Sequence, residues 1–303
     1  MIATVLFFSA MSHSSSTSPE SVAQSTSKPI AVVASIKPLA LIAQDIVGDL
    51  GVVDVLVPPT SSPHDYAMKM SDARKLSKAD KVIWFGGDLE QFLVKKIKGL
   101  ESKRVITIKG LPGNHDDHND PEHQEHKDLH LWLNPILAKQ IAEKIGEALI
   151  TDQQAMGNHS TVEELQSQLK QTLTNYDNLS KELEVTFSSV RKIGFIVYHN
   201  AYDHLVEQFN LRQIGYVSVH PEIPVGLKHM AELEIKIANE LKRGPVKCLF
   251  VESSHQSGSA EEIARRLDLK IRALDILGSN NDVSTYIELM RQVAKDMSSC
   301  LQS

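Results

Sequence analysis

Hydrophobic positions along this chain recur with two alternating periods. From residue 28 onward, short apolar runs rich in Val and Ile alternate with stretches in which apolar residues return every three or four positions. The first pattern is typical of buried strands and the second of amphipathic helices. Strands and helices that alternate at this spacing need crossover connections, so the pattern predicts mostly parallel sheets covered by helices on both faces.

The first part of the chain contains four predicted strands. Asn134 followed by Pro135 is a capping residue before a proline at the first helical position, and it marks the start of a further helix. The predicted strands are residues 30–35, 52–57, 81–86 and 105–108, and the predicted helices are residues 38–48, 71–79, 88–97 and a segment from 135 onward.

The longest periodic stretch follows this first part. Apolar residues recur every three or four positions from Val162 to Val190, and residues 160–163 have the sequence of a capping box. At ~1.5 Å per residue this helix would be roughly 45 Å long, which is enough to run across two lobes. Beyond it, strands are predicted at 193–198, 213–218, 248–251 and 270–274, and helices at 201–209, 226–241, 259–267 and 283–297.

These patterns predict an α/β protein of two lobes, each with a mostly parallel sheet flanked by helices, joined by a long rigid connecting helix. We place the first lobe at residues 28–158, the connecting helix at 159–190 and the second lobe at 191–303. Residues 1–27 begin with an apolar run too short to span a bilayer and continue as a Ser-rich stretch. They resemble a secretory leader without its basic start, and they favour a periplasmic location.

Charge and cysteine content narrow the choice of partners and compartment. A formal net charge of -6 argues against nucleic acids and anionic membranes as partners, because both require basic patches. The chain has two cysteines, Cys248 and Cys300. An isolated pair in an exported protein usually forms one bond, so we expect a disulfide between them.

The stretch from Asn114 to Pro135 has the most distinctive chemistry. Imidazole and carboxylate side chains are interleaved there, and these are ligands that Zn²⁺, Cu²⁺ and Ni²⁺ accept. A solvated polar loop is the plain alternative, but such loops are usually rich in Ser, Gly and Lys. Five of the thirteen histidines fall in this stretch, namely His115, His118, His123, His126 and His130, with His130 where the chain re-enters the folded body.

Polar residues at strand ends supply further candidate ligands. In open α/β sheets, ligands bind beyond the carboxyl ends of the strands. His64, His199, Glu252 and Asp275 each follow a predicted strand. Together with His130 they offer three imidazoles and one or two carboxylates from both halves of the chain, a set suited to four-coordinate Zn²⁺. We expect structural or surface roles for His204, His220, His229 and His255.

At these residues the chain resembles the extracytoplasmic receptors of zinc and manganese ABC importers. The resemblance runs from about Pro29 to Cys300 and implies two α/β lobes joined by a long rigid helix. The matching segments are Pro63-His64-Asp65-Tyr66 with Lys69 and Ser71-Asp72, Asp128-Leu129-His130-Leu131-Trp132-Leu133-Asn134-Pro135, Tyr198-His199-Asn200-Ala201-Tyr202, Pro221-Glu222-Ile223, and Leu274-Asp275-Ile276-Leu277-Gly278.

This resemblance implies a role for each candidate residue. His64, His130 and His199 would be the metal ligands, and Asp275 would complete or adjoin the ligand set. Because the manganese members carry Glu in place of His199, the resemblance favours Zn²⁺. The protein would then be a monomeric zinc receptor that delivers its ion to the membrane permease of an ABC importer. The loop 114–127 would collect metal weakly through His115, His118, His123 and His126.

Two other functions compete with this reading. A free periplasmic metal chaperone or buffer would use the same ligands, and the absence of a neighbouring permease gene would distinguish it. A zinc hydrolase needs an open coordination position and a general base. No His-Glu-x-x-His motif occurs in the sequence, so we expect a binding protein and not an enzyme.

Overall fold

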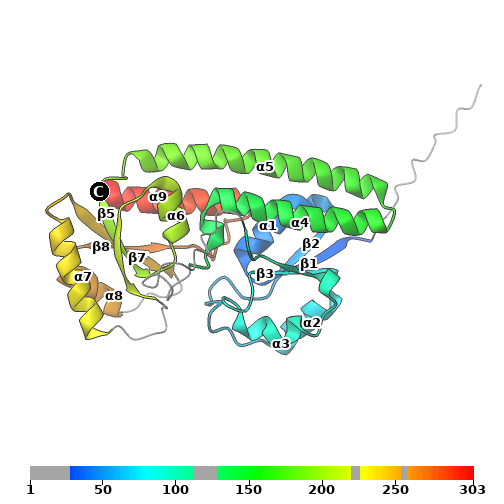
Figure 1. Ribbon diagram of the computed structural model, residues 1–303, viewed down its shortest axis with the longest axis horizontal. Coiled ribbons are helices and arrows are strands. Elements are labelled where there is room, and N and C mark those ends of the chain that lie inside the picture. The colour runs from blue at the N-terminus through cyan, green and yellow to red at the C-terminus, as the bar shows by residue number, and fades with distance from the viewer. Residues whose placement is uncertain (1–27, 112–127, 220–225, 254–257) are drawn as a thin grey trace, which may run out of the picture.

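The chain folds into two α/β lobes that lie side by side beneath one long helix (Figure 1). The computed structural model describes residues 28–111, 128–219, 226–253 and 258–303. Each lobe is built on a four-stranded sheet in which every pair of neighbouring strands is parallel. The predicted fold class is therefore confirmed.

The first lobe has the strand order β2-β1-β3-β4. Its central strands are apolar along almost their whole length, as expected for parallel strands buried on both faces. The strands are β1 (Ile30–Ala34), β2 (Gly51–Val55), β3 (Lys81–Trp84) and β4 (Val105–Thr107), and the helices are α1 (Lys37–Val47), α2 (Met70–Lys78), α3 (Val94–Ile97) and α4 (Pro135–Ala155).

The second lobe repeats this topology, with the strand order β6-β5-β7-β8. In both lobes the chain starts on an inner strand, adds the next strand on one side and places the last two on the other. The strands are β5 (Gly194–His199), β6 (Gln213–Ser218), β7 (Val246–Glu252) and β8 (Lys270–Leu274), and the helices are α6 (Asp203–Phe209), α7 (Leu227–Glu240), α8 (Gly258–Arg266) and α9 (Tyr286–Gln302).

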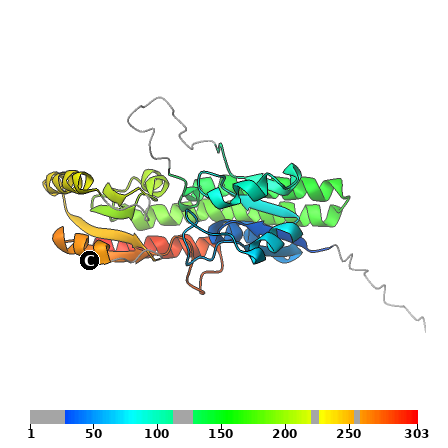
Figure 2. The same cartoon turned by 90° about the horizontal axis from the view of Figure 1, so that it is seen from below.

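The long helix α5 (His159–Ser188) spans both lobes, as the periodicity predicted. It packs on α1 and α4 of the first lobe and on α6 and α9 of the second, and it runs along the length of the molecule in both views (Figures 1 and 2). None of the helices in the described ranges is both long and apolar enough to cross a membrane. The exact lobe boundaries at residues 158 and 190 stay a prediction.

The buried Tyr176 near the middle of α5 contacts both lobes. The Tyr176 hydroxyl donates to Asp45 Oδ2 of α1 at 2.7 Å, and its ring lies 4.8 Å from that of Tyr286 in α9. The Tyr286 hydroxyl donates in turn to the Trp132 carbonyl at 2.7 Å. Burial raises the pKa of Asp45 to about 6. The helix is thus hydrogen-bonded to the first lobe and packs its Tyr176 ring on the second, whose Tyr286 bonds back to the first lobe.

Two local predictions were wrong at helix starts. The segment 88–97 is a turn followed by a 3₁₀ turn at Gln91–Leu93 and the short α3, because the Glu90 side chain folds back onto the amides of Phe85 and Gly86. The capping box predicted at residues 160–163 does not cap α5, since the helix already begins at His159 with Asn158 as its N-cap.

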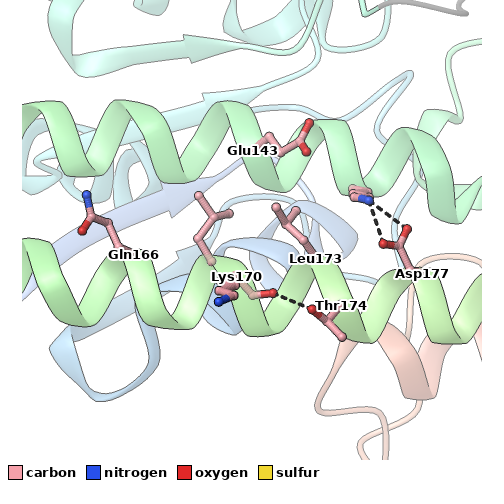
Figure 3. A pocket seen from close by; sticks show the side chains of 8 residues that line it. Glu143, Gln166, Lys170, Leu173, Thr174 and Asp177 are labelled. Carbon is pink, nitrogen blue, oxygen red and sulfur yellow. Dashed lines mark hydrogen bonds and ion pairs between the residues drawn. The ribbon is translucent and has the colours of Figure 1, made fainter.

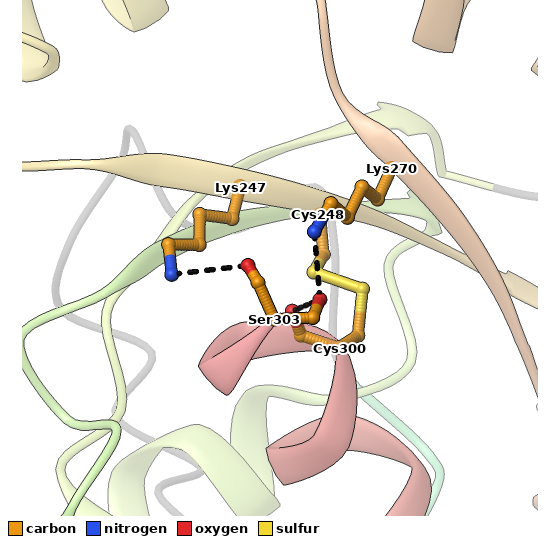
Figure 4. The surroundings of a disulfide bond; sticks show 5 residues. All are labelled: Lys247, Cys248, Lys270, Cys300 and Ser303. Carbon is orange, nitrogen blue, oxygen red and sulfur yellow. Dashed lines mark hydrogen bonds between the residues drawn. A yellow bond between two sulfur atoms is a disulfide. The ribbon is translucent and has the colours of Figure 1, made fainter.

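The expected disulfide is present in the second lobe (Figure 4). It joins Cys248 of β7 to Cys300 of α9, with the two Cα atoms 6.4 Å apart. The ammonium groups of Lys247 and Lys270 donate to Ser303 beside it. The last helix is therefore covalently fixed to a central strand.

Candidate metal centre

Three histidines from separate segments meet where the two lobes face each other. Each of His64, His130 and His199 presents one ring nitrogen within 4.8 Å of the other two. Their ring centroids are 5.0 to 5.6 Å apart. A single ion bound through all three rings would hold the lobes together, since His64 and His130 belong to the first lobe and His199 to the second.

The local sequence explains how each ring reaches this point. His64 lies in the loop after β2, and its amide donates to the hydroxyl of Ser62 at 3.2 Å. His130 precedes the 3₁₀ turn Leu131–Leu133 that leads into α4, where Asn134 caps the helix by accepting two backbone N–H groups. His199 is the last residue of β5. Each histidine is thus held near regular structure: His64 in the loop after β2, His130 just before the turn into α4, and His199 at the end of β5.

The His130 ring is oriented by a buried carboxylate. Asp128 Oδ1 lies 2.7 Å from His130 Nδ1 and also accepts the His130 backbone N–H at 2.8 Å. These hydrogen bonds and the nearby imidazoles hold the pKa of Asp128 down at about 2 in spite of its burial. An ionised carboxylate accepts the proton on Nδ1, which leaves Nε2 with a lone pair for a metal ion.

The His199 ring has the same kind of partner. Glu252, the last residue of β7, places Oε1 against His199 Nδ1, and both side chains are buried. Paired carboxylates of this type fix the tautomer and strengthen the ring as a ligand. Two of the three imidazoles are therefore held ready for a cation.

Asp128 also connects the two lobes. Its Oδ2 accepts the backbone N–H of Asp203, the first residue of α6, at 2.9 Å. Its carbonyl accepts a hydrogen bond from His204 Nε2 at 2.9 Å. The carboxylate that orients a ligand in the first lobe is thus anchored to a helix of the second.

Asp275 is not among the groups that converge within 4.8 Å. It follows β8 as predicted, but its Oδ2 accepts hydrogen bonds from the Ser279 hydroxyl and the Asn280 amide, both at 2.9 Å. Its role as a fourth ligand stays a prediction.

The other histidines take the places expected for them where they are described. His204 donates to Asp128 as above, and His229 of α7 donates to the Tyr216 carbonyl at 2.9 Å. The auxiliary low-affinity site at His115, His118, His123 and His126, together with His220 and His255, lies outside the described residues.

The positioning roles of two carboxylates were not foreseen. The sequence places Asp128 among many acidic residues of the His-rich stretch, and it offers Glu252 as a possible ligand or, in a hydrolase, a possible base. The spacing Asp128-x-His130 was the available signal, because a carboxylate two residues before a ligand can reach its backbone N–H. No comparable local signal marks Glu252, which is fifty-three residues from its partner in sequence.

A separate hollow of about 340 Å³ lies between α4 and α5 (Figure 3). It is shallow and is lined by polar and apolar residues of these two helices alone, with an ion pair between Lys139 and Asp177 at one end. None of the predicted site residues lines it. The chemistry of the molecule therefore centres on the histidines.

A pair of α/β lobes with imidazoles from both lobes meeting at their junction defines a two-lobed metal-binding protein. The family model described as "zinc-uptake complex component A periplasmic" matches residues 32–300. The chain belongs to this family.

Individual relatives agree with this assignment along most of their length. The chain is 29% identical over 301 residues to the high-affinity zinc uptake system protein ZnuA of Yersinia pestis, covering 90% of this chain and 91% of the relative. It is 28% identical to the ZnuA protein of Haemophilus influenzae, covering 89% and 92%. A crystal structure of ZnuA shares the fold with a TM-score of 0.73, 23% identity and coverage of 90% and 99%.

Proposed function

We propose that this protein is a zinc receptor that captures Zn²⁺ outside the cytoplasm and passes it to the membrane permease of an ABC importer. The observation that carries the proposal is the convergence of His64, His130 and His199, two of them backed by buried carboxylates. Three converging imidazoles are a donor set suited to holding a divalent ion tightly. The relatives named above are zinc uptake proteins, and we propose that this chain likewise binds its ion without transforming it.

The donor set favours zinc. Imidazole nitrogen suits Zn²⁺, whereas Mn²⁺ prefers oxygen ligands. We propose Asp275 or a water molecule as the fourth ligand, which would complete a tetrahedral site. A deletion mutant of ZnuA with the same fold was crystallised with zinc bound, at a TM-score of 0.72 and 24% identity. We further propose a periplasmic monomer in which the loop 114–127 collects zinc weakly.

Metal analysis tests this function directly. Protein purified without chelators should carry one tightly bound zinc ion per chain, and the His64→Ala/His130→Ala/His199→Ala variant should carry none at that affinity. Single His→Ala variants should each weaken binding by at least tenfold, because the three histidines are proposed to bind one ion together. Competition with a zinc-selective dye measures this. Unchanged affinity in any one variant would remove that histidine from the ligand set.

A further inference from the structure

A short loop after β8 is held by the opposite lobe. This loop, residues 275–280 and here called the Asp275 loop, lies at the junction of the lobes in both views (Figures 1 and 2). The ammonium of Lys37, the first residue of α1, donates to the Gly278 carbonyl at 2.6 Å and lies 3.4 Å from that of Asn280. Lys37 of the first lobe is therefore hydrogen-bonded to the Asp275 loop of the second lobe.

The helix itself gains nothing from a lysine at this position. The N-terminus of a helix carries a partial positive charge, so an ammonium group there is unfavourable. The first turn of α1 contains no acidic residue to offset it. The favourable contacts of Lys37 are instead the two loop carbonyls across the lobe junction.

The Asp275 loop also adjoins the metal centre. Trp132 Nε1 donates to the Ile276 carbonyl at 2.9 Å, and the Trp132 ring lies 5.0 Å from the His130 ring. On the strand side, Leu274 pairs in register with Glu252, whose carboxylate orients a ligand. The loop thus begins next to Glu252, the partner of His199. It then bonds to Trp132, whose ring packs against His130.

The loop is folded on itself through Asp275. The Asp275 carboxylate accepts hydrogen bonds from Ser279 and Asn280, which brace the loop internally. Through the bond from Trp132 to the Ile276 carbonyl, this braced loop is connected to the ring that packs on His130. We propose that Lys37 is a positioning residue that latches the Asp275 loop over the metal centre and slows zinc release. This inference rests on the proposed function.

The test is the rate of zinc release from the full chain. Lys37→Met keeps the length and apolar stem of the side chain but removes its ammonium, and we expect zinc to dissociate into excess chelator about tenfold faster. Lys37→Arg retains charge and donors and should stay within about twofold of the wild type. Lys75→Met is the matched control, because Lys75 donates to the Val55 carbonyl within one lobe.

A double-mutant cycle with Ser279→Ala separates a latch from a general structural effect, because the Ser279 hydroxyl braces the loop through Asp275 and is not a proposed zinc ligand. If Lys37 acts through the loop, Lys37→Met should speed release less in the Ser279→Ala background than in the wild type. Equal acceleration in both backgrounds, or no acceleration by Lys37→Met, would overturn the inference. Failure of the proposed function looks different: the wild type itself would then bind no zinc, or bind it unchanged after His199→Ala.

Discussion

At the scale of single residues, the metal centre depends on carboxylates as much as on histidines. The sequence predicts His64, His130 and His199 because each lies beside the end of a regular element, and strand ends meet at the same edge of a sheet. What the sequence does not predict is which carboxylate turns toward which ring, because this depends on rotamers set by tertiary packing. Asp128 and Glu252 take these positions in the folded protein.

Asp128→Asn should weaken zinc binding by about ten- to a hundredfold. Both carboxylate oxygens have partners, His130 on one side and the Asp203 amide on the other, whereas asparagine has only one oxygen and no charge. Dye competition measures the affinity. Asp80→Asn is the control, since Asp80 accepts hydrogen bonds from Lys28 and the Ala31 amide away from the histidines. Equal affinities for the wild type and Asp128→Asn would contradict the orienting role.

Glu90 gives a second prediction at this scale. It is fully buried at the carboxyl ends of β1 and β3, where it accepts hydrogen bonds from the Ser35 hydroxyl and two amides, and burial raises its pKa to about 7. Between its unfolded pKa near ~4.5 and its folded value, the native state keeps a proton that the unfolded state has lost. The protonated Glu90 side chain therefore stabilises the native state in acid, and this contribution is lost as the pH rises through 7.

The measurement compares metal-free wild type with Glu90→Gln, which cannot titrate. Urea denaturation gives the free energy of unfolding of each protein. Between pH 4.5 and pH 8, that of the wild type should fall by up to about 3 kcal/mol relative to that of Glu90→Gln. Subtraction cancels the titration of all other groups. A difference that stays constant over this range would show that Glu90 is ionised throughout.

At the scale of elements, the sequence predicts helices and strands well where apolar periodicity is long. The α5 helix is the clearest case, because its apolar positions recur over eight turns and dominate any local signal. The predicted bounds of 159–190 agree with it closely, and only the capping box at 160–163 was wrong, because Asn158, which follows Gly157 with φ of 75°, takes the N-cap position. The helix predicted from 88 fails because Glu90 accepts hydrogen bonds from the nearby Phe85 and Gly86 amides and, across the lobe, from the Ser35 hydroxyl.

The His-rich stretch should act as a separate element from the metal centre. Replacing residues 114–127 with a short Gly-Ser linker, while keeping Asp128, should leave the tight site unchanged and reduce only the number of weakly bound ions. The reason is that the three converging histidines lie on the folded scaffold that fixes their geometry. Zinc titration at low and high metal concentration distinguishes the two classes. Loss of the tight site on replacement would show that the loop supplies a ligand.

At the scale of the whole molecule, the two lobes form one structural body. A single cluster of buried apolar residues runs from β1 and α1 through α4 and α5 to β5, β7 and α9. The α5 helix contributes to it along its length, with Leu165 against the first lobe and Phe187 against the second. Because this largest cluster is shared by both lobes and α5, the lobes should lose their structure together.

We therefore expect calorimetry of the metal-free protein to show one unfolding transition, with equal calorimetric and van't Hoff enthalpies. Zinc should shift that whole transition upward, because its ligands come from both lobes and the unfolded chain has no such site. Free zinc at a hundred times its dissociation constant should add about 2.7 kcal/mol of stability. The triple histidine variant should keep the single transition and lose the shift. Two transitions, of which zinc moves only one, would mean that the lobes unfold independently and that the ion is held by one of them.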